Sequence, residues 1–126
     1  MSSDMPIKVE ISVDKEEYKR GEPIKIKFSI MNKTNSSLVL TFRTAKMFDI
    51  FLLDKDKKII GRWAKDKVFA QMITNLTLGP LETLERVIPW NIFKDILIFP
   101  GEYYFEGYVE TMQGKYSSNL VKIKIK

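Results

Sequence analysis

Apolar and polar residues alternate along much of the chain with a period of two. IKVEISV, at residues 7–13, and IKIKFSI, at residues 24–30, place an apolar residue at every second position. This alternation is typical of β-strands that bury one face and expose the other. MFDIFLLD, at residues 47–54, is apolar on both faces apart from Asp49, which indicates a central strand.

Turn-forming residues such as Gly, Pro, Asn and Ser separate these segments at intervals of roughly ten residues. The segment AKDKVFAQMI, at residues 64–73, has no strand pattern, and we expect a short helix or an irregular crossover there. Further strands are expected at 38–42, 59–63, 75–78, 82–90, 101–110 and 119–126. Eight or nine short strands without βαβ alternation predict an all-β fold, an antiparallel β-sandwich, with a partly closed barrel as the alternative.

The composition is that of an ordinary globular protein, with 44% hydrophobic and 29% charged residues among 126. This length predicts one domain over residues 1–126. No uncharged run approaches the roughly 20 residues of a membrane helix, and the start MSSDMPIKVE does not resemble a secretory signal. We therefore expect a cytoplasmic protein that does not enter a membrane. Abundant Lys, Ile and Glu without Cys also suggest a thermophile.

The chain contains no cysteine and no histidine. Disulfides, thiolate nucleophiles, zinc–cysteine sites and Ser–His or Cys–His catalysis are therefore excluded. The turn DKDKK, at residues 54–58, has only the first two acidic ligands of a calcium loop, and no glycine-rich phosphate loop is present. We predict that the protein is not an enzyme and that it uses neither a metal ion nor another cofactor.

The net charge is +5, and lysines occupy the polar positions of several predicted strands. Lys25 and Lys27 do so in the second strand, as do Lys122, Lys124 and Lys126 in the last. Lysines along an exposed edge discourage pairing with another chain. We prefer this role to a nucleic-acid groove, because no base-stacking aromatic residues are interleaved with these lysines. A nucleic-acid partner is therefore not expected; it would require steeply salt-dependent binding.

One stretch departs from the alternation. WNIFKDILIFPGEYYF, at residues 90–105, contains ten large apolar residues among sixteen and is divided by Pro100-Gly101. We expect the hydroxyl of Tyr103 to hydrogen-bond back to the preceding connection and to hold it in place. Trp63 and Trp90 are expected to anchor the core, which is what large aromatic side chains do most often.

Two interpretations of the connection 91–99 stay open. In one, its apolar side chains cover the open end of the core. In the other, residues 96–99 project as an apolar patch that contacts a partner, because loops lie on the surface. The segment 64–73 is a second candidate contact. The candidate protein-binding residues are Ile96, Leu97, Ile98 and Phe99 in the first segment and Phe69 and Met72 in the second.

An ordered series of motifs resembles the intracellular proteinase inhibitor family, also called the BsuPI family. The series comprises an Asn-Thr turn with Leu-x-Phe, an aromatic-Asp strand, a tryptophan, Phe-x-Gln, a Pro-Gly-Glu turn, a second tryptophan and a Pro-Gly-x-Tyr corner. The resemblance covers about residues 28–109, although the turn here reads Gly-Pro-Leu-Glu and the segment before Pro100 reads KDILIF. The matching positions are Asn32, Leu40, Phe42, Phe48, Asp49, Trp63, Phe69, Gln71, Pro80, Glu82, Trp90, Pro100, Gly101 and Tyr103.

The resemblance implies an immunoglobulin-like β-sandwich that inhibits or regulates an intracellular serine protease of the subtilisin type. In that interpretation an end loop lies extended in the protease cleft and pairs with it as an added strand. Such clefts favour a large apolar side chain, and the candidates are Leu97, Phe99, Met72 and Phe69. The alternative is an immunoglobulin-like module that binds another protein and has no protease target.

Overall fold

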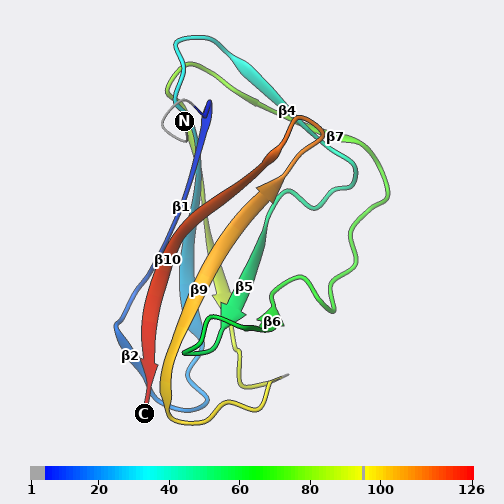
Figure 1. Ribbon diagram of the computed structural model, residues 1–126. Helices are drawn as coiled ribbons and strands as arrows, with labels where there is room; N and C mark the ends of the chain where they lie inside the picture. The colour runs from blue at the N-terminus through cyan, green and yellow to red at the C-terminus, as the bar shows by residue number, and fades with distance from the viewer. Residues whose placement is uncertain (1–4, 95) are drawn as a thin grey trace.

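The computed structural model describes residues 5–94 and 96–126, so the first four residues of the expected domain and Asp95 lie outside the described residues. The described residues form ten strands and no helix (Figure 1). The strands are β1 (Ile7–Val13), β2 (Glu17–Tyr18), β3 (Ile24–Asn32), β4 (Leu38–Phe42), β5 (Asp49–Leu53), β6 (Ile59–Arg62), β7 (Thr74–Leu78), β8 (Thr83–Trp90), β9 (Gly101–Glu110) and β10 (Lys115–Ile125).

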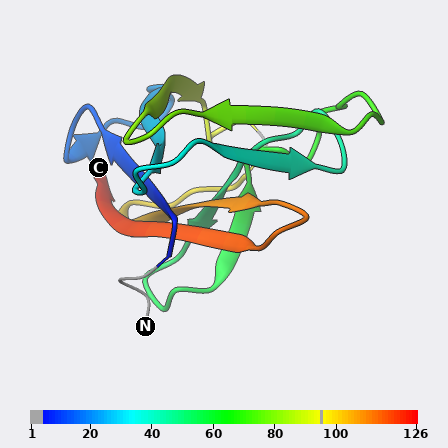
Figure 2. The ribbon, with the colours of Figure 1, turned by 90° about the horizontal axis from the view of Figure 1, so that it is seen from above.

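The strands form two main sheets and one two-stranded ribbon. One sheet has the order β1-β3-β8, and the other has the order β2-β10-β9-β5-β6. β5 lies inside the second sheet, as its apolar pattern predicted. β4 pairs with β7, and Figure 2 shows the two strands side by side from above. The pairings are antiparallel except that of β2 with β10. The predicted all-β sandwich is therefore confirmed, and the segment 64–73 is an irregular crossover.

β2 is an element that the sequence pattern did not predict. Glu17 and Tyr18 lie within the polar turn expected between the first two strands, yet they pair in parallel with Lys124 and Ile125 of β10. Tyr18 is almost completely buried, and its hydroxyl donates a hydrogen bond to Asp14 at 2.6 Å. Two residues are too few to show a period, so the alternation could not reveal this strand.

The expected position of Lys25 and Lys27 at a sheet edge is wrong. β3 is the central strand of its sheet, so these lysines lie on the outer face of the sandwich. Lys27 forms an ion pair there with Glu85 of the neighbouring β8 at 3.3 Å. The period of two identifies which face a residue occupies, but the position of the strand in its sheet depends on pairings between distant segments.

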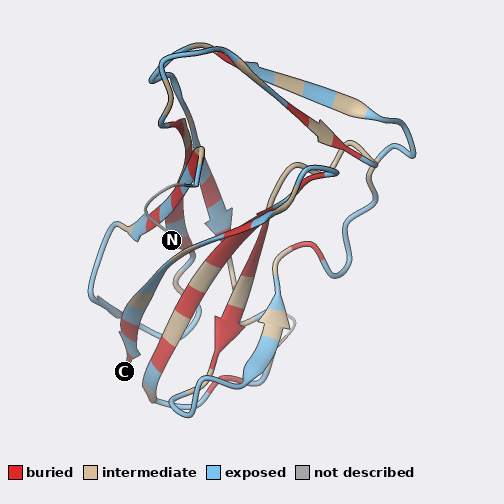
Figure 3. Ribbon diagram, turned by 45° about the horizontal axis from the view of Figure 1, so that its top comes forward, coloured by how far each residue is buried: buried red, intermediate tan, exposed pale blue. Residues whose placement is uncertain are grey.

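The core lies between the two main sheets. Buried residues alternate with exposed or partly exposed ones along β1, β3 and the first part of β9, as the red bands of Figure 3 show. The most deeply buried side chains are large and aliphatic or aromatic: Tyr18, Ile24, Ile26, Phe28, Ile30, Phe42, Ile50, Leu52, Leu78, Ile92, Phe105 and Ile123. Removing these side chains from water supplies the main driving force for folding.

A buried asparagine ties the ribbon β4–β7 to the rest of the sandwich. Asn32 is completely buried at the corner after β3, and its Nδ2 lies 2.8, 3.0 and 2.9 Å from the carbonyl oxygens of Ser36, Leu78 and Gly79. Its Oδ1 accepts hydrogen bonds from the amide and the hydroxyl of Thr34. Buried amides need such partners. This one side chain therefore holds the start of β4 and the end of β7, which lie together at one end of the ribbon.

The two sheets approach each other most tightly at a glycine, and this contact gives a first prediction. A Cβ at Gly107 would lie 2.5 Å from the ring of Phe28 and 2.9 Å from Ile11. We expect Gly107→Ala to lower the free energy of unfolding by ~1–3 kcal/mol, because the core would be overpacked. Urea denaturation measures this change. Gly114→Ala is the control, because its Cβ would meet nothing closer than 3.4 Å; an equal loss in both variants would contradict the prediction.

Candidate protein-binding site

In the connection between β8 and β9, residues 96–99 turn their side chains alternately inward and outward. Ile92 and Ile98 are buried in the core, and Ile96 is half-buried. Leu97 and Phe99 point outward and are 79% and 60% exposed. The connection therefore does two things at once: it covers one end of the core and exposes two large apolar side chains.

The neighbours of Leu97 are fixed on both sides. The Cδ1 of Ile96 lies against Gly61, where an added Cβ would collide with it unless the end of the Ile96 side chain moved. On the other side, Ile98 is buried, and its carbonyl oxygen accepts a hydrogen bond from Nη2 of Arg20 at 3.1 Å. Leu97 thus projects from a short backbone segment that is held at both ends.

Aromatic residues fix the two ends of the same connection. The hydroxyl of Tyr103 donates to the carbonyl of Phe99 at 2.7 Å and accepts from the amide of Phe99 at 3.2 Å, which is the geometry of a tyrosine corner. At the other end, Trp90 is buried, and its ring centroid lies 5.7 Å from that of Phe105. Both side chains therefore connect the loop to the core.

The second candidate segment, residues 64–73, is less tightly held. The amide of Ala45 donates to the carbonyl of Ala70 at 2.9 Å, which attaches the middle of the segment to the loop before β5. Val68 and Met72 are exposed, whereas Phe69 is half-buried. The segment consequently presents apolar side chains, but they do not alternate with buried ones as in the first connection.

A series of aromatic rings connects this segment with the core. Phe28 stacks on Phe48 with ring centroids 4.6 Å apart, and Phe48 stacks on Trp63 at 5.3 Å. Trp63 in turn contacts Phe69 at 6.3 Å. The Nζ of Lys67 lies 4.8 Å above the ring of Trp63, in cation–π contact. These contacts explain why Phe69 is half-buried.

A buried carboxylate fixes the start of the same segment. Asp49 is completely buried, and its Oδ1 accepts hydrogen bonds from the amides of Ile50 at 2.8 Å and Ala64 at 3.0 Å. Its Oδ2 lies 3.3 Å from Nζ of Lys46 and 3.4 Å from Nε of Arg62. A buried charge needs such partners, so Asp49 joins the loop before β5, the end of β6 and the segment after it.

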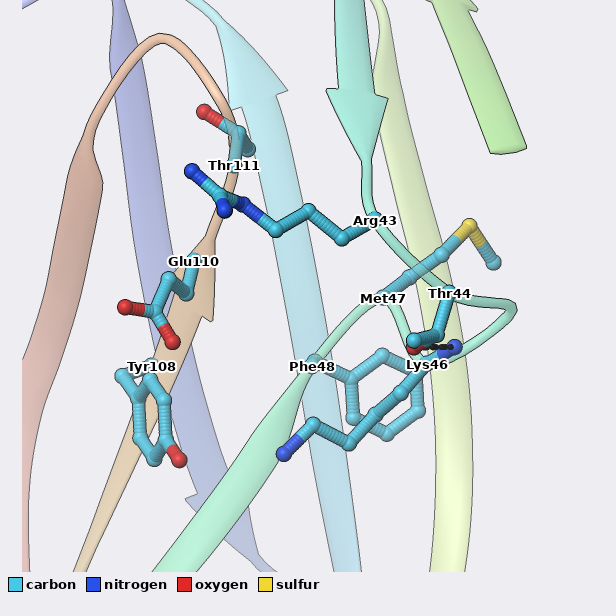
Figure 4. A pocket seen from close by; sticks show the side chains of 8 residues that line it. All are labelled: Arg43, Thr44, Lys46, Met47, Phe48, Tyr108, Glu110 and Thr111. Carbon is cyan, nitrogen blue, oxygen red and sulfur yellow. Dashed lines mark hydrogen bonds between the residues drawn. The ribbon is translucent and has the colours of Figure 1, made fainter. Parts of the chain in front are cut away.

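One pocket, of about 530 Å³, lies beside this carboxylate and is drawn in Figure 4. The hydroxyl of Tyr108 in its wall donates to Asp49 at 3.4 Å. Burial raises the pKa of Tyr108, and the negative charge of Asp49 raises it further, so the hydroxyl keeps its proton. The pocket has mixed charge and contains none of the sequence-predicted binding residues. Its lining residues are Arg43, Thr44, Lys46, Met47, Phe48, Tyr108, Glu110 and Thr111.

A second pocket, of about 350 Å³, lies between the two candidate segments. It brings Leu97 and Ile96 next to Trp63 and Trp90, whereas Phe69, Met72, Ile98 and Phe99 do not line it. We take this pocket and the exposed side chains around it as the candidate site. Its lining residues are Ile60, Gly61, Arg62, Trp63, Lys65, Asp66, Lys67, Trp90, Ile96 and Leu97.

The sequence analysis missed the contribution of β6 to this surface. β6 is an edge strand of the larger sheet, and its first two residues, Ile59 and Ile60, are both exposed. Two consecutive apolar residues in a strand point to opposite faces, so they cannot both enter one core. This pair of isoleucines was the signal in the sequence that could have revealed exposed apolar surface on β6. The rest of the strand is short and resembles the second strand of an ordinary hairpin.

The chain matches a known family. The family model described as "Intracellular proteinase inhibitor" (BsuPI) matches residues 11–114. The chain belongs to the BsuPI family. The match extends the resemblance found in residues 28–109, and it includes Asn32, Asp49 and the whole connection between β8 and β9.

Individual proteins resemble this BsuPI member over shorter stretches or at low identity. Arrestin-C of Xenopus laevis is 40% identical over 63 residues, which span 48% of this chain and 16% of the arrestin. Spo0M, a sporulation control protein of Bacillus subtilis, superposes with a TM-score of 0.63 and 17% identity over 97% of this chain and 50% of its own. The CARDB domain of PF1109 from Pyrococcus furiosus, in complex with di-metal ions, has a TM-score of 0.54 and 11% identity over 95% of this chain and 87% of its own. These two structures show the fold alone.

Within residues 5–94 and 96–126, no three acidic side chains are grouped so that they could hold a metal ion. The same residues include no helix of the length and apolarity needed to cross a membrane.

The hydroxyl of Tyr103 gives a prediction about the stiffness of the candidate loop. We expect Tyr103→Phe to lower the free energy of unfolding by about 1 kcal/mol, because two hydrogen bonds to Phe99 are lost. The amide of Phe99 should also exchange its hydrogen faster in native-state exchange experiments. Tyr104→Phe is the control, since the Tyr104 hydroxyl has no hydrogen-bond partner among the described residues. Unchanged exchange at Phe99 in Tyr103→Phe would refute the proposed restraint.

The buried carboxylate gives a second prediction. Asp49→Ala should lower the free energy of unfolding by about 3 kcal/mol, because two buried amides and two cations lose their partner. Asp66→Ala, an exposed aspartate in the segment that Asp49 holds, should change it by less than about 0.5 kcal/mol. Denaturation followed by tryptophan fluorescence compares the two, and similar small changes in both would show that Asp49 does not organise this region.

Proposed function

We propose that this BsuPI-family protein inhibits a serine protease of the subtilisin type by inserting the connection 96–99 into the substrate cleft. The compartment that we propose is the cytoplasm, in keeping with the family's description as intracellular. The observation that carries the proposal is Leu97, an exposed leucine between two restrained neighbours. The absence of histidine and cysteine supports binding rather than catalysis.

Restraint matters because an inhibitory loop must lose little conformational freedom on binding. Ile96 packs over Gly61, Ile98 lies in the core, and the backbone of Phe99 is bonded to Tyr103. Leu97 is therefore already presented before a protease arrives. A loop without disulfides can be stiff in this way only if its own side chains enter the core.

The apolar side chains can supply a substantial part of the binding free energy. Burying Leu97 and Phe99 completely would contribute ~1.5–3 kcal/mol each, whereas a micromolar complex requires ~8 kcal/mol. The remainder would come from backbone pairing in the cleft and from the exposed isoleucines of β6. Ile59 and Ile60 lie on the edge strand that borders the same pocket.

The segment 64–73 is the weaker candidate for the inserted loop. Phe69 is half-buried against Trp63, so its ring is not free to enter a protease pocket. Met72 is exposed, but Gln71 and Ile73 on either side of it are exposed as well. We therefore assign this segment to the border of the contact rather than to its centre.

A second candidate function is a binding module with a partner that is not a protease. The edge of β6 favours it, because an edge strand with exposed isoleucines can add a strand from any extended peptide. In that case the partner would occupy β6, and Leu97 would contribute only from the side.

Substitution of Leu97 tests the proposed inhibition. We expect the wild type to inhibit at least one purified subtilisin-type protease, and Leu97→Asp to raise Ki by ~10-fold or more, because a charge replaces a buried apolar side chain. Leu81→Asp is the matched control: Leu81 is 56% exposed in the turn between β7 and β8, and its replacement should leave Ki unchanged.

Two results would count against this assignment. No inhibition by the wild type at micromolar concentration across a panel of such proteases would reject the function. Strong inhibition that is abolished by Met72→Asp but not by Leu97→Asp would keep the function and transfer the contact to the segment 64–73.

A further inference from the structure

Positive charge is concentrated beside the proposed inhibitory loop. Residues 54–67 contain six lysine or arginine residues and three aspartates, a formal charge of +3, in a chain whose total is +5. These residues form the β5–β6 turn, β6 itself and the start of the following segment. More than half of the net charge therefore lies in one short part of the chain.

This charge borders the loop on several sides. Lys65 and Lys67 line the same pocket as Leu97. Lys55, at the β5–β6 turn, lines a depression together with Pro100, just beyond Phe99; Asp54, Asp56 and Glu102 line it as well. Arg20, which follows β2, donates a hydrogen bond to the carbonyl oxygen of Ile98. We call this set the basic rim; it consists of Arg20, Lys55, Lys57, Lys58, Lys65 and Lys67.

The rim differs in its partners from the lysines that form ion pairs on the outer faces of the sheets. On the outer faces of the sheets, lysines lie within ion-pair distance of glutamates, as in the pairs Lys8–Glu10, Lys27–Glu85, Lys122–Glu102 and Lys126–Glu17. Among the described residues, no carboxylate lies within 4 Å of any rim cation. Lys57 and Lys67 instead lie over the rings of Tyr104 and Trp63, at 5.1 and 4.8 Å. Within the part of the chain that the structure describes, the rim cations thus have no carboxylate partner to give up when an acidic surface approaches.

We propose that the basic rim docks on an acidic surface beside the cleft of the target protease. This inference rests on the proposed inhibition and adds the kind of protease that is recognised: one whose cleft is bordered by Asp and Glu. Opposite charges on two surfaces accelerate encounter and orient the partners. Because exposed charges are screened over about 8 Å at physiological ionic strength, the effect must weaken with added salt.

An acidic protein surface suits the rim better than a nucleic acid does. Binding of single-stranded nucleic acid needs exposed aromatic faces among the cations. Trp63, which lines the pocket with Lys65 and Lys67, is stacked on Phe48 on one side and contacted by Lys67. Of the two large apolar side chains that the loop exposes, Leu97 is aliphatic and only Phe99 presents an aromatic face.

The test measures the association rate of the wild type with a protease that it inhibits, at low and at high ionic strength. We expect kon to fall by about 10-fold or more between roughly 20 and 500 mM salt, with little change in koff. Lys55→Glu/Lys65→Glu should lower kon at low salt by a similar factor. Lys8→Glu/Lys25→Glu, with the same change in net charge on the outer face of the three-stranded sheet, should change kon by less than about 2-fold.

The outcomes separate this inference from the function on which it rests. Inhibition with a salt-independent kon, equal in both double variants, would overturn the basic rim and leave the inhibitory loop intact. No inhibition by the wild type would overturn both. Salt-dependent binding of an oligonucleotide that competes with the protease would assign the rim to nucleic acid and would likewise overturn the inference.

Discussion

The two sheets meet over an interface of buried aliphatic and aromatic side chains, and the rest of the structure depends on closing the ends of that interface. Between β8 and β9 the chain closes one end with Ile92 and Ile98. Since neighbouring residues of an extended segment point in opposite directions, burying Ile98 directs Leu97 and Phe99 outward. The exposed leucine is thus a direct consequence of how the core is covered. The same residues that stabilise the fold also restrain the loop that we propose as the inhibitory one.

Polar and aromatic contacts also restrain the neighbouring segment, residues 64–73. Asp49 reaches Ala64 through a hydrogen bond and Arg62 through an ion pair, while Phe48, next to it in sequence, stacks on Trp63. Phe48, at the end of the loop before β5, and Asp49, the first residue of β5, therefore hold Arg62, Trp63 and Ala64 in place beside the pocket that Leu97 lines. The surface is built from three separate parts of the chain, yet each part is attached to the same core.

The strands and their buried faces could be predicted because a period of two is a local signal. The roles of single polar residues could not, since their partners are remote in sequence: Asn32 bonds the carbonyl of Leu78, and Asn119 bonds the backbone of Ile11. β2 and the edge position of β6 were missed for the same reason, because a strand's neighbours are chosen by the whole fold. The motif series located Asn32 and Asp49 without explaining them; the contacts supply the explanation.

An apolar centre and a charged border contribute to binding in different ways. Desolvated apolar contacts such as those proposed for Leu97 chiefly determine how long a complex lasts, whereas surrounding charges chiefly determine how fast it forms. Residues 54–67, which border the loop, carry a formal charge of +3 of the chain's +5, and the loop itself carries exposed apolar side chains. A chain without cysteine and histidine can therefore use one end of a β-sandwich both to form a complex quickly and to keep it for long, provided that its loop is anchored in the core.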